Sequence, residues 1–222
     1  MNNSLLNTAR LLAAGLRALL VLTLVTGVLY PLAVTGVAQS LFRDKADGSE
    51  ISAQGRVVGS SLIGQAYDLP LAKGQETPAL DLKWFQGRPQ NGLGVNSVNT
   101  RYKLILSGAT NRAGDDRELV EWVTAAKAAV VRDNSVPGHP VRPSQVPADA
   151  VTSSGSGLDP DISPAYAELQ APRVAARNGL PVARVEQLVK DHTQGRTLGF
   201  MGEPRVNVLE LNVALRGLTG GR

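Results

Sequence analysis

The distribution of apolar residues divides the chain into two unequal parts. The 25 residues from Ala18 to Phe42 contain no charged side chain, whereas charges recur throughout the rest. As a helix this stretch is roughly 37 Å long, and the hydrocarbon core of a bilayer is about 30 Å thick. The pattern therefore predicts a transmembrane helix over residues 18–40, with a short N-terminal segment 1–17 before it and a linker 41–54 after it.

Basic residues indicate the direction in which this helix crosses the membrane. Arg10 and Arg17 precede the apolar run without any acidic residue, so the positive-inside rule predicts a cytoplasmic N-terminus. Residues 55–222 would then form an extracytoplasmic, periplasmic domain. A cleaved signal peptide is the alternative, because residues 36–38 (Gly-Val-Ala) form an acceptable small-x-small cleavage site, but the length of the run and Pro31 within it favour a retained anchor.

Small residues recur on one flank of the predicted helix. Thr23, Gly27, Pro31 and Thr35 follow one another at a spacing of four. Small side chains allow another helix to approach closely, and in lipid such packing drives helix association. We interpret these four residues as a candidate helix-packing site; the alternative is that glycine and threonine are simply common in membrane helices.

Beyond residue 55, short β-type runs alternate with amphipathic helices. The β-type runs cover residues 56–64, 82–85 and 102–106. Helices are predicted over residues 115–132, 163–178 and 181–195 and after Asn207, and Pro172 is expected to interrupt the second of them. The expected N-caps are Asp115, Ser163 and Asn207. The pattern predicts one compact α+β domain.

Composition excludes several kinds of chemistry. Lysine and arginine total 23 against 19 acidic residues, and without Arg10 and Arg17 the remainder is nearly neutral, which argues against nucleic acid. The absence of cysteine excludes a disulfide scaffold, a cysteine nucleophile and a zinc-thiolate site. The two histidines, His139 and His192, lie far apart in the sequence, so no metal site is predicted.

A serine-rich segment supplies the residue types of a hydrolase without the pattern of one. Ser153 to Gly157, together with Asp159, Asp161 and His192, contains candidate nucleophiles, acids and a base. The Gly-x-Ser-x-Gly elbow is missing, so a turn before Ser163 is the simpler interpretation. No Gly-Lys dipeptide occurs, which excludes a P-loop. No catalytic residue is predicted; a membrane-anchored or secreted serine-type hydrolase and an anchored binding module stay as alternatives.

Seven segments in order resemble one family over nearly the whole chain. They are residues 26–32 (TGVLYPL), 59–65 (GSSLIGQ), 85–89 (FQGRP), 107–111 (SGATN), 151–164 (VTSSGSGLDPDISP), 172–175 (PRVA) and 206–212 (VNVLELN). Together they are similar to the C subunit of the bacterial potassium-transporting ATPase, the KdpC family.

The resemblance implies a non-catalytic accessory subunit of an ATP-driven potassium importer in the inner membrane. Its implied partners are a channel-like A subunit, a P-type B subunit that hydrolyses ATP and a small F subunit. The family is described as assembling the complex and as a catalytic chaperone that raises the ATP affinity of the B subunit. The resemblance gives the chain no cofactor of its own and ATP only through that description. Because the domain is predicted outside and lacks a phosphate loop, we expect such an effect to be allosteric, through the anchor.

Overall fold

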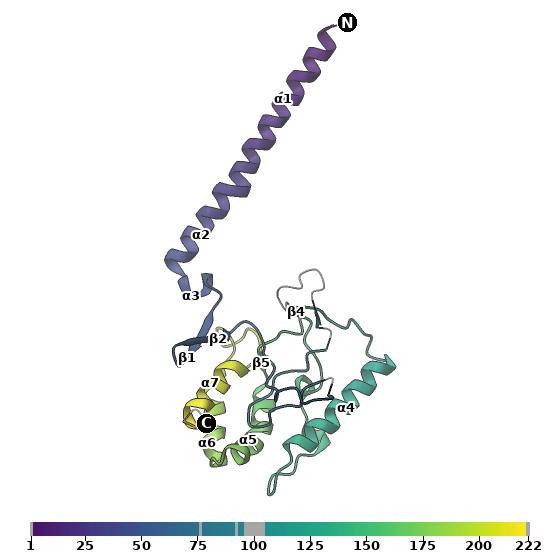
Figure 1. Cartoon of the computed structure of the whole chain (residues 1–222), viewed down its shortest axis with the longest axis vertical. Coiled ribbons are helices and arrows are strands. Elements are labelled where there is room, and N and C mark those ends of the chain that lie inside the picture. The colour runs from purple at the N-terminus through teal and green to yellow at the C-terminus, as the bar shows by residue number, and fades with distance from the viewer. Residues whose placement is uncertain (1, 76, 92, 96–104, 221–222) are drawn as a thin grey trace. The chain divides into compact units, whose positions relative to one another are not determined.

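The computed structural model describes residues 2–75, 77–91, 93–95 and 105–220 (Figure 1). The chain separates into two compact units, Met1–Glu50 and Ile51–Arg222. The first consists of helices, and the second, hereafter the domain, combines helices with small antiparallel sheets. The predicted fold class, one long apolar helix followed by an α+β domain, is confirmed.

The first unit contains one long helix with a widened turn in its middle. α1 (Asn2–Leu24) continues through a π-helical turn, η1 (Val25–Leu29), into α2 (Tyr30–Leu41), and the short α3 (Arg43–Ala46) follows. Hereafter α1, η1 and α2 are the N-terminal helix. Its stretch Ser4–Leu41 is long and apolar enough to cross a membrane, with a mean hydropathy of 2.1, and its most apolar window is not buried by the protein.

Pro31 explains why the turn widens at this point. Proline has no N–H to donate, and in a regular α-helix its ring clashes with the carbonyl four residues earlier, here that of Gly27. In the structure the N–H of Tyr30 reaches back five residues to the carbonyl of Val25. The Thr26 hydroxyl donates to the Leu22 carbonyl at 2.7 Å. The wide turn therefore accommodates the proline without breaking the helix.

The domain contains three small sheets within the described residues. The first pairs β1 (Glu50–Ala53) with β2 (Arg56–Ser60), and the second pairs β3 (Gly94–Val95) with β4 (Ile105–Leu106). In the third, β7 (Arg205–Asn207) lies between β5 (Asp161–Ile162) and β6 (Thr193–Gln194), antiparallel to both.

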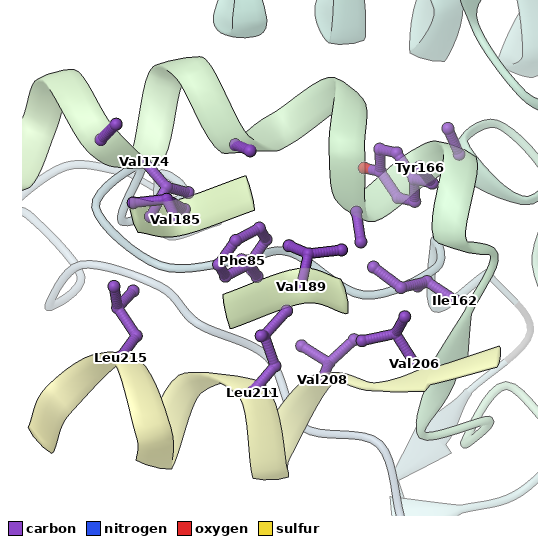
Figure 2. Packing of buried hydrophobic residues seen from close by; sticks show 14 of the residues in the cluster. Phe85, Ile162, Tyr166, Val174, Val185, Val189, Val206, Val208, Leu211 and Leu215 are labelled. Carbon is purple, nitrogen blue, oxygen red and sulfur yellow. The ribbon is translucent and has the colours of Figure 1, made fainter. Parts of the chain in front are cut away.

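Helices enclose the main hydrophobic core. They are α4 (Arg117–Asn134), α5 (Pro164–Asn178), α6 (Val182–Asp191) and α7 (Val208–Leu218), with short 3-10 turns η2 (Pro143–Gln145) and η3 (Ala148–Ala150) before α5. Figure 2 shows Phe85 and Val189 between α5 and α7. Phe85, Val185, Val189, Leu211 and Leu215 are fully buried.

Two helix boundaries agree with the sequence and others correct it. The hydroxyl of Ser163 caps α5, and the amide oxygen of Asn207 caps α7. The first helix of the domain is capped by Asp116 rather than by Asp115. α5 continues through Pro172, because neighbouring residues of this helix are buried in the core and their packing offsets the missing hydrogen bond.

The strand predictions were less accurate. Within residues 56–64, only Arg56–Ser60 is a strand, and residues 82–85 pair with no strand of the described chain. Of the run 102–106, residues 102–104 lie outside the described residues, and 105–106 form β4. The helix predicted up to residue 195 ends at Asp191, and β6 follows. The predicted linker 41–54 contains α3 and β1.

Candidate functional site

The first candidate site lies on the N-terminal helix. The π turn lies between Thr23 and Pro31 and includes Gly27. In a regular α-helix a spacing of four advances by about 40° per step, so four such residues drift around the axis. A π turn rotates less per residue and offsets part of this drift. The widened turn thus brings Thr23, Gly27, Pro31 and Thr35 closer to one line.

The surface around Gly27 is open within this helix. A Cβ placed on Gly27 would meet only the Thr23 Cγ2 atom, at 3.9 Å. All four flank residues are exposed in the chain. Their packing against another helix stays a prediction.

The second candidate site is the place where the domain's sequence motifs meet, and segment 82–86 is its centre. Each of the five carbonyl groups of this segment accepts a hydrogen bond from a side chain. Arg173 donates to the carbonyls of Leu82 and Trp84, and the amide of Asn178 donates to that of Lys83 at 2.7 Å. These side chains therefore donate the hydrogen bonds that a neighbouring strand would donate in a sheet.

Two amide side chains complete this arrangement by binding both backbone groups of one residue. Asn212 of α7 accepts from the N–H of Phe85 and donates to its carbonyl, both at 2.9 Å. Gln170 of α5 accepts from the N–H of Gln86 at 2.7 Å and donates to its carbonyl at 3.0 Å. Each pair reproduces the exchange of two hydrogen bonds between strands. The segment is therefore held between α5 and α7.

Arg173 is a buried charge whose hydrogen-bond partners are all neutral. Its side chain is 1% exposed and also donates to the Asn134 amide oxygen at 2.9 Å and to Gln170 at 2.7 Å. Burial, which disfavours the charged form, lowers the pKa of Arg173 to about 10. Burial likewise raises the pKa of the neighbouring Tyr166 to about 12, although the charge of Arg173 opposes this shift. Both groups keep their ordinary protonation near neutral pH.

The loop 151–164 is tied to four other motifs. Arg88 pairs with Asp159 at 3.0 Å and donates to the carbonyls of Thr152 and Ser153. The N–H of Gly64 donates to the Leu158 carbonyl at 2.8 Å. A Cβ on Gly64 would lie 2.5 Å from the Asp159 carbonyl oxygen, so only glycine fits there.

The other two contacts of this loop use hydroxyl and amide groups. The Ser107 hydroxyl donates to the Ser156 carbonyl at 2.8 Å. The amide of Asn207 donates to the Ser61 carbonyl at 2.8 Å and lies 3.3 Å from Asp161. Asp161 also pairs with Arg205, but burial is the larger influence and raises its pKa. Hydrogen bonds and ion pairs thus connect the motifs to one another.

The serine segment forms a turn. The hydroxyls of Ser156 and Ser154 accept from the backbone N–H groups of Leu158 and Asp159 respectively. His192 uses Nδ1 to contact the Leu188 carbonyl of its own helix at 2.9 Å. Among the described residues, neither serine has a hydrogen bond to His192, and no cluster of three metal-ligating side chains occurs. The arrangement fits a turn rather than a nucleophile with its base.

A cavity of about 330 Å³ lies beside the end of segment 82–86. Gln86, Arg88, Tyr166, Gln170 and Arg173 line it, together with residues of α4. Sequence reasoning found the motifs but not the roles of Gln170, Arg173 and Asn212. The sequence signal for these roles was the presence of polar residues on helix faces that are otherwise apolar. A polar residue is seldom buried unless it has a hydrogen-bond partner.

The chain thus combines a helix long and apolar enough to cross a membrane with a domain whose polar motifs hold its own loops. The sequence model of the family described as "K+-transporting ATPase, c chain" (KdpC) matches residues 12–217. The chain therefore belongs to the KdpC family. Members of this family are subunits of the ATPase complex and are not enzymes by themselves.

Similar proteins match along nearly their full length. The chain is 76% identical over 215 residues to the potassium-transporting ATPase KdpC subunit of Streptomyces coelicolor, covering 97% of this chain and 96% of that protein. It is 75% identical to that of Streptomyces avermitilis, with 98% of each chain covered. It is 45% identical to that of Gemmatimonas aurantiaca, with 92% of this chain and 93% of that one covered.

Proposed function

We propose that this chain assembles and stabilises a potassium-transporting ATPase as a non-catalytic subunit attached by one membrane helix. Residues 1–17 lie in the cytoplasm, residues 18–40 span the inner membrane, 41–54 form the linker, and 55–222 lie on the periplasmic side. One observation carries this proposal: the motif residues of the domain are committed to internal hydrogen bonds, whereas the surface of the long apolar helix is uncovered.

The uncovered helix surface supports contact with other membrane helices. Thr23, Gly27, Pro31 and Thr35 offer small side chains there, and close packing of such residues drives association in lipid. By family resemblance the partners are the channel-like A subunit, the P-type B subunit and the small F subunit, with the surrounding lipid.

An effect on ATP affinity would be transmitted through this helix. ATP is hydrolysed on the cytoplasmic side, whereas the domain is proposed to lie outside, and the sequence lacks a phosphate-binding loop. Packing against the pump would bias its conformational equilibrium and so change ATP affinity without contacting the nucleotide. The catalytic-chaperone role then needs no cofactor on this chain.

Co-purification tests the proposal. We expect a tagged chain extracted in mild detergent to bring the other subunits of a potassium-transporting ATPase with it. Recovery of the chain alone would instead support an anchored binding module. Hydrolytic activity that Ser154→Ala or Ser156→Ala abolishes would revive the serine-hydrolase alternative.

Cysteine labelling tests the topology, because the chain has no cysteine of its own. Ser4 and Ser144 are both exposed and lie in the two units. A membrane-impermeant maleimide should label Ser144→Cys in cells with a permeable outer membrane, and Ser4→Cys only after the inner membrane is opened. The reverse pattern would contradict the orientation.

A further inference from the structure

Residues 197–201 form a tight turn that holds large apolar side chains in water. The backbone N–H of Thr197 donates to the Met201 carbonyl at 2.9 Å, and the N–H of Met201 donates back at 3.0 Å. At its base, Arg196 pairs with Glu203 at 2.8 Å. Leu198 is 79% exposed, Phe200 70% and Met201 48%. We refer to these three side chains as the apolar tip.

The backbone of the tip is strained at Leu198. Its φ of +54° is left-handed, where the Cβ of an L-residue approaches the next carbonyl oxygen. Gly199 and Gly202, at φ +83° and +77°, take similar conformations without that conflict. A leucine held in a strained conformation and displayed to solvent contributes nothing evident to folding. Such strain is characteristic of functional positions.

The size of the tip limits what can cover it. A side chain such as phenylalanine buries about 150–250 Å². Three of them provide a few hundred Å², whereas a stable interface needs roughly 800 Å² from each partner. The tip is therefore too small to hold a second copy of this chain by itself. It suits a partner that another contact already holds nearby.

The charges around the tip argue against a lipid surface as the occupant. Segments that lie on membranes are rich in uncompensated lysine and arginine. Here Arg196 is paired with Glu203, whose side chain is 81% exposed and would approach anionic headgroups. A preorganised turn with a phenylalanine at its tip instead resembles the rigid aromatic anchors that fill pockets in protein interfaces.

We propose that the apolar tip inserts into an apolar pocket on the outer surface of an integral-membrane subunit of the same ATPase. The chain is then attached at two points, the N-terminal helix and the tip. Each contact raises the effective concentration for the other, so a small tip adds substantially to the stability of the complex. This inference rests on the proposed function and adds the surface that the domain uses.

Two substitutions in the full chain, co-expressed with its partner subunits, test the tip. Phe200→Ser should lower the amount of chain recovered with a tagged partner subunit at least five-fold. Leu198→Gly removes the side chain but suits a left-handed φ, so it should reduce recovery without destabilising the domain. Leu71→Ser is the matched control, because Leu71 is also exposed, at 57%, and lies outside the tip; its recovery should equal that of wild type.

The outcomes separate the two proposals. If the wild-type chain recovers no partner, the proposed function fails. If the wild type recovers the complex and both tip variants recover it equally well, only the tip inference is overturned.

A single cysteine then identifies the occupant. Phe200→Cys carrying a benzophenone should crosslink to an ATPase subunit in the assembled complex. A crosslink to a second copy of this chain would overturn the inference. So would strong quenching of a fluorophore at residue 200 by nitroxide lipids in nanodiscs that contain the complex.

Discussion

The N-terminal helix and the domain use polar and apolar residues in opposite ways. In the N-terminal helix nearly every large side chain is apolar and exposed, and a few small residues lie between them on the surface. In the domain, Gln170, Arg173 and Asn212 are buried and bind backbone groups. The helix therefore depends on partners or lipid for cohesion, whereas the domain is stabilised from within by polar side chains.

This comparison also explains how the motifs divide between the two units. Those of the domain identify the family in the sequence, and each contributes to one network around segment 82–86 and loop 151–164. A network of satisfied buried polar groups fixes a single arrangement, because the loss of one partner leaves another unpaired. The two units should consequently respond differently to substitution.

The largest effect is expected at Arg173. Arg173→Leu removes the donor to the carbonyls of Leu82 and Trp84 and to the amide oxygen of Asn134. Each buried acceptor left unpaired costs about 1–3 kcal/mol, so we expect a loss of about 3–5 kcal/mol in total. Chemical denaturation of the full chain in detergent, followed by the fluorescence of the two tryptophans, measures it. Arg177→Leu, an exposed position on the same helix, should change stability by less than about 0.5 kcal/mol.

A smaller loss is expected at Asn212. Asn212→Leu keeps the volume of the side chain but leaves the N–H and carbonyl of Phe85 buried and unpaired. Each unsatisfied group costs about 1–3 kcal/mol, and the added apolar contact recovers part of this, so we expect a net loss of about 2–3 kcal/mol. The same denaturation experiment applies. A variant as stable as wild type would show that another group pairs with the Phe85 backbone.

The cap residues and the buried polar residues show what could be predicted from the sequence. Ser163 and Asn207 were predicted because a cap depends on residues within one turn. The continuity of α5 through Pro172 was missed, because it depends on packing against distant elements. The roles of Gln170 and Asn212 were missed for the same reason: their partners lie 84 and 127 residues away.

Alkaline pH probes the buried surroundings of Tyr166. Its pKa is raised from 10.0 to about 12, so the folded protein keeps a proton that the unfolded chain loses above pH 10. The resulting stability is fully present below pH 10 and is lost as pH rises toward 12, by an amount on the order of 2 kcal/mol. Tyr166→Phe should lack this loss. Denaturation of both proteins between pH 9 and 12 tests this prediction. If the free energy of unfolding falls equally with pH in the two proteins, the buried setting of Tyr166 is contradicted.

The smallest effect is expected on the N-terminal helix, where substitution should leave the domain intact and weaken assembly. Gly27→Leu adds a four-carbon side chain where only Thr23 lies within 4 Å, so the isolated chain has room for it. In the complex that side chain would separate the packed helices, and the loss of one contact, about 1 kcal/mol, lowers affinity roughly five-fold. Recovery of the complex after detergent extraction measures this change.

Two controls determine whether packing is responsible. Gly15→Leu makes the same substitution in the same helix, at a position where an added Cβ would have no neighbour within 4 Å, and so matches the change in helix propensity. Leu22→Ala lies one residue before the flank and is turned from Thr23 by about 100°. Both should assemble as wild type does. If Gly27→Leu also does, the N-terminal helix serves only as an anchor, and the domain supplies the contacts that hold the complex together.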